Sequence, residues 1–364
     1  MGERFKTMNF QTLQIHIPRW IITNPIISPL DLIYQIDYTP LITLMITVAK
    51  KIHEEILGAN KILIISHKNP DGDTLSSACA LMQYLQSCNK DHQAFCATPI
   101  NKNLAFLPHL EHFSTTPEIF KKDFFDVVVV FDSGDLLYAG VEDYLDNLDY
   151  SPTIINIDHH PTNQFYGHHN LVVPSAASTT EVLYRFFQIN DVEIDKNLAT
   201  CLLTGIVTDT GHFSNPSTSA SSLKIASRLM NAGANLRLIQ GWTLKNKTLN
   251  GLKLWGQVLS RLQKNEELDI ATTIITKEDV EKNKISDEEI EGLANFLNNL
   301  SGAKVIMVLR EKDDGVIKGS LRTTSSEVDV SELAKIFGGG GHAKAAGFSI
   351  NGKLEEKDGM WQVV

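Results

Sequence analysis

Three short apolar runs, each followed at once by acidic or histidine residues, constrain this chain more than any other feature. Residues 62–65, 127–131 and 153–157 have the length and the β-branched composition of strands that are buried on both faces. In an open parallel sheet, ligands bind beyond the carboxyl ends of the strands, so we expect the polar residues there to converge. These residues are His67, Asp71 and Asp73 after the first run, Asp132 after the second, and Asp158, His159 and His160 after the third.

The residue types at these strand ends suit a divalent metal. Histidine nitrogen and carboxylate oxygen are usual ligands of manganese and other first-row ions. Asp71 and Asp73 flank a glycine and can point to different sides of one turn, which would suit two neighbouring ions. The alternative is structural, because Asn-Pro-Asp-Gly is an ordinary turn sequence and Asp often caps the helix that follows a strand. The coincidence of three such strand ends favours the metal site.

Helical patterns follow these runs. Apolar spacing predicts helices over residues 74–86 and 196–207. Ser178 and Glu181 have the spacing of a capping box and predict a further helix through Phe187. The helix over 196–207 leads to Asp209, for which the residues alone leave two roles open, a further metal ligand or the cap of a turn. Residues 226–262 also have a helical pattern.

The pattern changes at Asp269 to that of a second, smaller domain. Strands are predicted over residues 271–275, 303–310, 316–322 and 348–350, and helices over 287–300 and 329–336. A run of four glycines, residues 338–341, precedes His342, and we expect a helix to open at Ala343. Glycine amides at the start of a helix would form a seat for an anion. The alternative of a flexible linker is weaker, because His342 interrupts the run.

The expected fold is α/β with two domains. A parallel-sheet domain with flanking helices covers residues 46–235, a helical connector covers 236–264, and a smaller α/β domain covers 265–364, with the active site in the cleft between the domains. Residues 1–45 form an N-terminal extension of unclear status. Prolines break its apolar segments, which are too short to span a bilayer and lack the form of a secretory signal. We expect the functional domain to begin near Met45.

Charge and cysteine content narrow the class of partner and the compartment. The net charge of −10 argues against a broad basic surface for long nucleic acid, but it permits a short phosphorylated ligand in a cleft. The four cysteines show no C-x-x-C pairing and fit the reduced thiols of a cytoplasmic protein better than disulfides or zinc ligands. No membrane partner is expected.

Taken together and in order, the motifs resemble those of the DHH phosphoesterases. The four N-terminal motifs are residues 67–73, Asp132, residues 158–160 and residues 204–211, and residues 338–347 resemble the signature of the DHH-associated C-terminal domain. The resemblance covers about residues 46–350. Within the family, the layout looks most like the bacterial oligoribonucleases that degrade nanoRNA and also dephosphorylate 3′-phosphoadenosine 5′-phosphate.

The resemblance implies a site with two divalent ions, Mn²⁺ before other metals. Its six ligands would be His67 and Asp71 on one ion, Asp73, His159 and Asp209 on the other, and Asp132 as a bridge. Asp158 would orient a neighbouring histidine instead of binding metal.

The resemblance also implies which residues meet the substrate. His160 would lie at the substrate phosphate and would be catalytic together with Asp132. A second set of residues in the C-terminal domain would hold the nucleotide: Arg322, Gly339, Gly340, Gly341 and His342. In this chain Ser76 stands where the family usually has glycine, and Phe213-Ser214 stands where a basic residue often follows the phenylalanine.

The activity implied is that of a manganese-dependent phosphoesterase. It would hydrolyse short oligoribonucleotides from one end to mononucleotides and remove the 3′-phosphate of 3′-phosphoadenosine 5′-phosphate. The alternatives are cleavage of linear or cyclic dinucleotides such as pApA, and a non-catalytic nucleotide or RNA sensor. The sensor is the weaker alternative, because all six implied ligands are present. The expected partners are short RNA and nucleotide phosphates, and a homodimer fits the resemblance although no stretch of the sequence specifies one.

Overall fold

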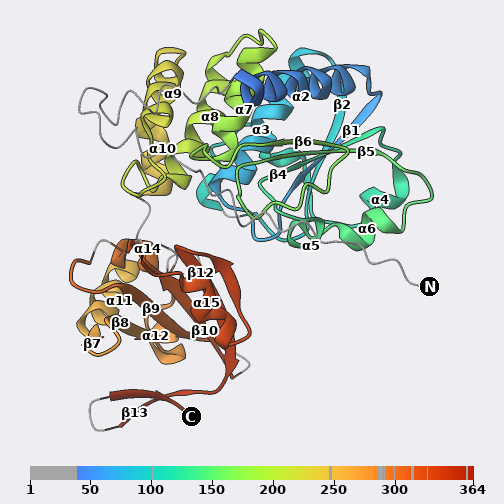
Figure 1. The fold of residues 1–364 in the computed structure, drawn as a ribbon. Helices are drawn as coiled ribbons and strands as arrows, with labels where there is room; N and C mark the ends of the chain where they lie inside the picture. Colours follow the sequence, from blue (N-terminus) through green and yellow to red (C-terminus); the bar gives the residue numbers. More distant parts are fainter. Residues whose placement is uncertain are drawn as a thin grey trace, which may run out of the picture. The chain divides into compact units, whose positions relative to one another are not determined.

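The protein is described by a computed structural model over residues 39–100, 102–245, 248–285, 290, 292–298, 300–312, 315–325, 327–357 and 360–364 (Figure 1). The chain divides into two compact units, Met1–Thr47 and Val48–Val364. Helix α2 (Thr39–Gly58) contains the described part of the first unit. Most of the predicted N-terminal extension, residues 1–38, lies outside the described residues. Among the residues that are described, none of the helices combines the length and the apolar character needed to cross a membrane.

Six parallel strands form the first sheet, in the order β3-β2-β1-β4-β5-β6. β1 pairs with β2 on one side and with β4 on the other, so Ser66 at the end of β1 aligns with Phe131 at the end of β4. The strand order changes direction between β1 and β4, and a switch of this kind opens a crevice at the carboxyl edge. The strands are β1 (Lys61–Ser66), β2 (Asp91–Cys96), β3 (Phe113–Ser114), β4 (Val127–Phe131), β5 (Thr153–Asp158) and β6 (His169–Val172).

Helices cover both faces of the parallel sheet. Leu63 and Ile65 of β1 and Val128 and Val130 of β4 face a cluster formed with the short helices α4 (Ile119–Lys122), α5 (Leu136–Ala139) and α6 (Glu142–Asp146). The opposite face carries α3 (Gly72–Ser87), α7 (Thr179–Ile189) and α8 (Lys196–Asp209), with α3 packed on both of the others (Figure 1). The predicted strands and helices of this region are therefore confirmed, and the continuous apolar runs are explained by burial on two faces.

The predicted helical stretch over 226–262 consists of three separate helices. They are α9 (Ala220–Asn231), α10 (Leu236–Thr243) and α11 (Leu249–Ser260), and the side chains of Ser219, Asn235 and Thr248 cap their starts. The apolar repeat was read correctly, but the caps divide it. Two short 3₁₀ helices, η2 (Lys102–Leu104) and η3 (Leu110–His112), lie between β2 and β3.

The second sheet has the order β11-β12-β10-β9-β8-β7, with β8 parallel to β9 and the other pairs antiparallel. Its strands are β7 (Gln263–Asn265), β8 (Ile270–Ile275), β9 (Val305–Glu311), β10 (Val316–Arg322), β11 (Gly340–His342) and β12 (Ala345–Asn351). Helices α12 (Lys277–Asn283), α14 (Leu293–Leu297) and α15 (Val330–Ile336) accompany it. Parts of the helix predicted over 287–300 lie outside the described residues. A hairpin that the sequence analysis did not predict, β13 (Leu354–Lys357) and β14 (Met360–Val363), follows the sheet.

The helix predicted to open at Ala343 is wrong. Gly340–His342 forms strand β11, which pairs with β12 so that His342 lies opposite Ala345. The two residues between them form a tight turn, where the carbonyls of Ala343 and Lys344 accept hydrogen bonds from the amides of Val330 and Thr323. The chain therefore turns back into the sheet at the point where a helix was expected. The last strand of the sheet begins at Ala345, three residues before the predicted start at Phe348.

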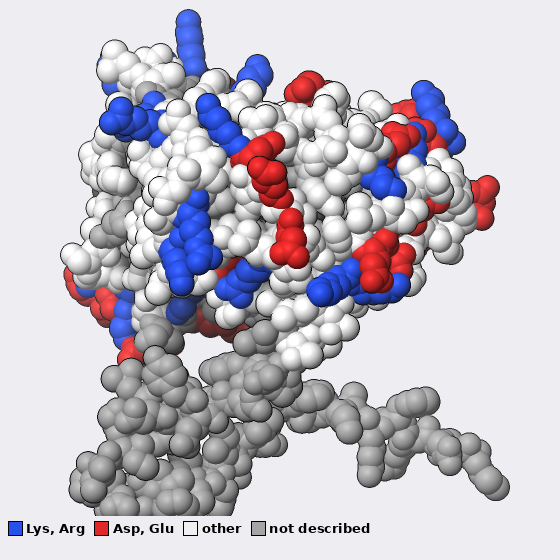
Figure 2. All heavy atoms as spheres, turned by 90° about the horizontal axis from the view of Figure 1, so that it is seen from above, with Lys and Arg blue, Asp and Glu red and all other residues white. Residues whose placement is uncertain are grey.

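Acidic and basic side chains are interspersed on the face of the molecule shown in Figure 2. This visible face does not carry a broad basic area, in keeping with the net charge of −10. Long nucleic acid would need a continuous basic surface for affinity.

Candidate metal centre

Three of the candidate ligands lie at the ends of adjacent strands of the parallel sheet. His67 follows β1, Asp132 follows β4 and His159 follows β5, and their side chains are only 4%, 4% and 15% exposed. His67 Nε2 lies 3.5 Å from Asp132 Oδ2, and His159 Nε2 lies 3.6 Å from Asp132 Oδ1. Asp132 therefore faces a different histidine with each of its carboxylate oxygens.

The backbone of Asp132 is left-handed, with a φ of +58°. Its amide donates a 3.1 Å hydrogen bond to the carbonyl of Ile157 on β5, so the end of β4 stays tied to its neighbour. Aspartate tolerates this conformation better than bulky residues do, although it is still uncommon outside glycine. The turn at Asp132 directs its carboxylate to the position between the two histidines.

Two helices bring the remaining carboxylates. Asp71 is the N-cap of α3, where its Oδ1 accepts hydrogen bonds from the amides of Asp73 and Thr74, and this oxygen lies 3.8 Å from His67 Nε2. Asp209 is the last residue of α8, and its Oδ2 lies 3.6 Å from His159 Nε2. The sequence left open whether Asp209 is a ligand or a cap, and its carboxylate points to the histidine.

Glycines allow α8 and α3 to approach closely enough for this arrangement. A Cβ on Gly205 would lie 2.3 Å from Thr180 Oγ1 and 2.5 Å from Asp73 Oδ1. A Cβ on Gly72 would lie 2.3 Å from Thr208 Oγ1. Any larger residue would push the helices apart, so these two glycines keep Asp73 and Asp209 at one site.

Two threonines that the sequence analysis did not name hold the carboxylates in place. Asp73 accepts hydrogen bonds from the amides of Thr179 and Thr180, at 2.6 and 3.0 Å, and from Thr180 Oγ1 at 2.9 Å. Thr179 Oγ1 donates to Asp132 Oδ1 at 2.9 Å. Both threonines begin α7, whose first amides have no partner within the helix and favour a negative charge. The capping-box spacing of Ser178 and Glu181 predicts where α7 begins, but not the contacts of its first residues with Asp73 and Asp132.

Asp158, which is buried, and His160, which is half-buried, form a hydrogen-bonded pair beside the candidate ligands. His160 Nδ1 donates a 2.7 Å hydrogen bond to Asp158 Oδ1, which also accepts from the amide of His159. Asn163 Nδ2 donates to Asp158 Oδ2 at 2.6 Å, so both oxygens of this carboxylate are engaged. Burial disfavours the charged ring, but the hydrogen bond to Asp158 and the charge of Asp132 outweigh it and raise the pKa of His160 to about 9.

The carboxylates repel one another while no cation separates them. Burial and the charge of Asp132 raise the pKa of Asp73 to about 7, and burial and the charge of Asp73 raise that of Asp209. The pKa of Asp132 is lowered despite its burial, because the close contact with His67 and the charges of His160 and His159 favour the carboxylate form. The raised pKa values of Asp73 and Asp209 reflect the crowding of negative charges in a buried site. A divalent cation bound there would balance these charges.

The set of donor atoms fits divalent metal ions. Atoms of three groups lie within 4.8 Å of one another, and the separations of 3.5 to 3.8 Å exceed a good hydrogen bond of about 2.9 Å. Such separations suit two ligands that each bind one shared ion at about 2.1 Å. Nitrogen and oxygen donors without a thiolate favour manganese-like ions. The groups are His67, Asp71 and Asp132; Asp73, His159 and Asp209; and Asp132, His159 and His160.

The predicted nucleotide-binding residues lie in the second sheet. Arg322 on β10 and His342 on β11 are both paired with Ala345 of β12, so the two positions share one end of the sheet. Gly339 packs against β12, where a Cβ would lie 2.2 Å from the carbonyl of Gly347. Because the glycines lead into a strand, the predicted anion seat at a helix start is wrong, and any contact with a ligand must come from the loop and strand amides themselves.

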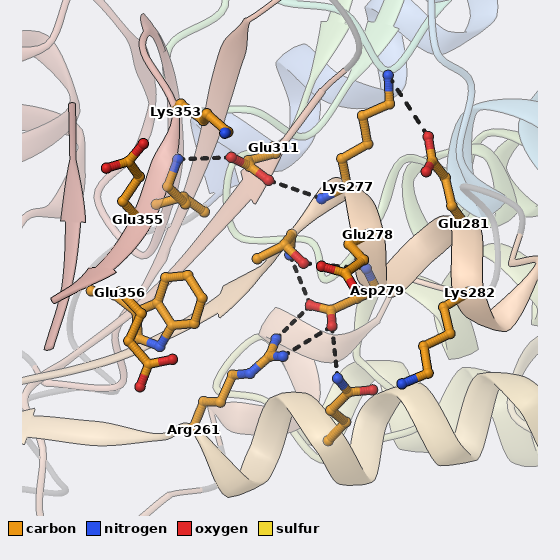
Figure 3. Close-up of a pocket in the computed structure, with 14 residues that line it drawn as sticks. Arg261, Lys277, Glu278, Asp279, Glu281, Lys282, Glu311, Lys353, Glu355 and Glu356 are labelled. Atoms are coloured by element: carbon orange, nitrogen blue, oxygen red, sulfur yellow. Dashed lines mark hydrogen bonds and ion pairs between the residues drawn. The ribbon is translucent and has the colours of Figure 1, made fainter. Parts of the chain in front are cut away.

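A cavity of about 690 Å³ also lies in the C-terminal region, between α11, α12 and the β13–β14 hairpin (Figure 3). None of the predicted site residues lines it. Arg261 binds both oxygens of Asp279, and Glu311 accepts hydrogen bonds from the amides of Lys277 and Leu354 (Figure 3). These charged groups are engaged within the protein, so we assign the cavity no ligand.

Family models match both regions of the chain. The DHH family N-terminal domain matches residues 61–206, and the DHHA1 domain matches residues 256–363. The chain belongs to the DHH family, whose members are metal-dependent phosphoesterases. The predicted family and the α/β fold are thereby confirmed.

Curated relatives and a solved structure resemble most of the chain. It is 32% identical over 294 residues to the bifunctional oligoribonuclease and PAP phosphatase NrnA of Thermus thermophilus, which covers 80% of this chain and 84% of the relative. The NrnA of Bacillus subtilis is 27% identical over 79% of this chain and 89% of the relative. The crystal structure of an exopolyphosphatase-related protein from Bacteroides fragilis superposes with a TM-score of 0.76 at 26% identity, over 83% of this chain and 90% of that one.

Proposed function

We propose that this protein is a manganese-dependent phosphoesterase that hydrolyses short oligoribonucleotides to mononucleotides and removes the 3′-phosphate of 3′-phosphoadenosine 5′-phosphate. The observation that carries the proposal is the placement of Asp132, whose two oxygens lie 3.5 and 3.6 Å from nitrogens of two different histidines. The substrates follow from the relatives of Thermus thermophilus and Bacillus subtilis, which are named as oligoribonucleases and PAP phosphatases.

The proposal assigns each candidate ligand to one of two ions. His67 and Asp71 would hold the first, Asp73, His159 and Asp209 the second, and Asp132 both. When bound, two divalent ions clamp a phosphoryl oxygen and acidify the attacking water. The protein's own contribution is to fix the ligands before the substrate arrives, through Thr179 and Thr180 on the carboxylates and the two glycines between α3 and α8.

His160 provides the proton chemistry in this scheme. Hydrolysis forms a bond from the water oxygen to phosphorus and breaks the bond from phosphorus to the leaving oxygen, which then needs a proton. Asp158 accepts from Nδ1 of His160, so Nε2 is the ring's second donor and points away from Asp158. We assign His160 to donate a hydrogen bond or a proton to the phosphoryl group.

The C-terminal region would bind the nucleotide through Arg322, the glycine run and His342, in the cleft between the domains. The glycine run itself supports this role. Gly338 and Gly341 have left-handed backbones, with φ of +72° and +140°, and Gly339 has no room for a side chain. Gly340 has neither constraint, since nothing lies within 4 Å of a Cβ built there. A glycine that the fold does not need suits the close approach of a ligand.

The proposal places the reaction in the cytoplasm. All four cysteines, Cys79, Cys88, Cys96 and Cys201, are free thiols in the structure, and three of them are buried. Reduced, unpaired thiols are usual in that compartment.

The proposal is tested by the hydrolysis of a 5′-labelled RNA trinucleotide and of 3′-phosphoadenosine 5′-phosphate, with Mn²⁺ and with a chelator. Wild type should release mononucleotides only with metal. Asp132→Asn keeps the shape of the side chain but removes the charge, and we expect it to lower kcat by about a thousand-fold or more. Asp146→Asn, on the exposed end of α6, is the matched control and should behave as wild type. Cleavage in chelator, or an unimpaired Asp132→Asn, would contradict the proposal, and faster cleavage of pApA than of the trinucleotide would favour the dinucleotide alternative.

A further inference from the structure

An aromatic residue outside the family motifs lies against the candidate metal centre. Tyr138 belongs to α5, which follows Asp132 by four residues, and its ring centroid lies 5.0 Å from that of His67 at an interplanar angle of 40°. One side of the ring thus packs on a candidate ligand. Tyr138 is nevertheless 50% exposed, so about half of the residue's surface remains open to a ligand.

The short helix that carries Tyr138 is fixed on the turn that carries His67. Asp135 caps α5, and its side chain accepts a 2.6 Å hydrogen bond from the amide of Tyr138. Lys68, the neighbour of His67, donates through Nζ to the carbonyl of Leu137 at 3.0 Å. This contact positions α5 and also directs the lysine ammonium to the helix carbonyl. The place of Tyr138 is therefore determined by the same turn that positions His67.

The hydroxyl of Tyr138 has no hydrogen-bond partner within the part of the chain that the structure describes. The ring of Tyr138 packs on His67, which with Asp71 and Asp132 makes up one candidate metal group. The phenolic O–H is a donor that no group in the described part of the chain uses.

We propose that Tyr138 contacts the substrate, its phenolic O–H donating a hydrogen bond to a phosphoryl oxygen at the group formed by His67, Asp71 and Asp132. This inference rests on the proposed function. The four aspartates and two divalent ions of the centre sum to no net charge, so a phosphate anion needs further donors. Tyr138 supplies one without adding a charge next to the ions, and the packing of its ring on His67 limits the positions that the ring can take.

The test compares Tyr138→Phe with Tyr144→Phe, which removes a hydroxyl from a residue of α6 that packs against the core cluster. Calorimetry measures the affinity of each protein for Mn²⁺ alone, and then for inorganic phosphate in the Mn²⁺-loaded protein. Tyr138→Phe should bind Mn²⁺ as wild type does, because the ring stays on His67. Its affinity for phosphate should fall about ten- to a hundred-fold, as should kcat/KM on the trinucleotide, which is the usual effect of losing one hydrogen bond to a charged group. Tyr144→Phe should change neither.

Unchanged phosphate affinity in Tyr138→Phe would overturn the inference. A parallel loss of Mn²⁺ affinity would also overturn it, because the residue would then only hold His67. Tyr138→Ala tests a third role, in which the ring stacks on the base of the nucleotide. In that case Tyr138→Ala would bind adenosine monophosphate more weakly, and Tyr138→Phe would bind both nucleotide and phosphate as wild type does. This result would show that the O–H is not used. If wild type cleaves none of the substrates but phosphate affinity still falls in Tyr138→Phe, the proposed function fails and the contact stands.

Discussion

The parallel sheet and the second sheet carry their candidate functional residues in opposite ways. In the parallel sheet, the side chains come from three strand ends and two helices between residues 67 and 209, and buried hydrogen bonds hold them. In the second sheet, the candidates lie within residues 322–342, on β10, on β11 and just before β11, and β10 and β11 flank β12 on its two sides. Most of them are glycines, which contribute backbone groups.

The difference indicates that the metal centre needs a rigid geometry, whereas the candidate binding surface of the second sheet can adapt. A centre built from converging buried side chains fails when any one neighbour moves, because its donors must meet within a few tenths of an ångström. A binding surface made from glycine amides depends on space and access instead. Substitutions in the first region should therefore abolish the chemistry, whereas substitutions in the second should change affinity and leave the centre intact.

The largest effect is expected for Gly205→Ala. The new Cβ would collide with Thr180 and Asp73, so we expect a loss of about 3 kcal/mol in the free energy of unfolding and the loss of measurable activity. Urea denaturation measures the loss of stability, hydrolysis of the trinucleotide measures the loss of activity, and Mn²⁺ calorimetry shows whether the centre still binds metal. Gly256→Ala in α11 is the matched control, since nothing lies within 4 Å of its Cβ and it should gain about 0.5–1 kcal/mol. Wild-type Mn²⁺ binding by Gly205→Ala would show that the centre tolerates a shifted α8.

The metal-free protein should lose stability as the pH rises. Although burial opposes it, contact with Asp132 and the charge of Asp71 raise the pKa of His67 to about 9, and that of His160 is also about 9. A histidine whose folded pKa exceeds its unfolded value of about 6.5 stabilises the protein fully below pH 6.5 and no longer above 9. We expect a decrease of up to about 3 kcal/mol per histidine across this window in chelator. A flat profile in urea denaturation would contradict the buried charge pairs.

Asp279→Asn tests the second region by its effect on the free energy of unfolding. The carboxylate of Asp279 is 4% exposed and accepts hydrogen bonds from Arg261, Gln257 and the amide of Thr276. Removing its charge leaves Arg261 without its counter-ion, and we expect a loss of about 2 kcal/mol. Mn²⁺ affinity, measured by calorimetry, should not change. A weaker Mn²⁺ affinity in this variant would show that the metal centre depends on the packing of the second region.

Gly340→Ala should have the smallest effect. A Cβ there meets no protein atom within 4 Å, so the free energy of unfolding should stay within about 0.5 kcal/mol of wild type. If a ligand uses that space, KM for the trinucleotide should rise about ten-fold with kcat nearly unchanged, which corresponds to about 1.4 kcal/mol of lost binding. Gly58→Ala, equally open in space, is the control in steady-state kinetics. Equal KM values for the two variants would remove Gly340 from the binding surface.

Much of the parallel-sheet region could be predicted from the sequence. Residues 62–65 and 127–131 are continuous apolar runs because both faces of β1 and β4 are covered, and that pattern is unambiguous. The polar residues after them converge because the ends of parallel strands share one edge. Strand β6 was missed, since it has four residues and begins with a polar pair.

The remaining features depend on long-range contacts that no local pattern contains. Thr179 and Thr180 look like ordinary helix-starting residues, and their contacts with Asp73 and Asp132 arise only when α7 packs against α3 and the end of β4. The glycine run predicts the start of a helix, but residues 340–342 pair with β12 and therefore form a strand. Tyr138 lies in a four-residue helix, and its contact with His67 arises only when this helix packs on the turn after β1.

The left-handed backbone of Asp132 means that the residue best suited to this turn is not the residue that the centre needs. A non-glycine residue in this conformation costs about 1 kcal/mol. Glycine at this position would remove the backbone cost, but His67 and His160 would lose the carboxylate that favours their charged forms. A laboratory selection for the stability of the metal-free protein alone should therefore retain aspartate at 132, even where the reaction is not required.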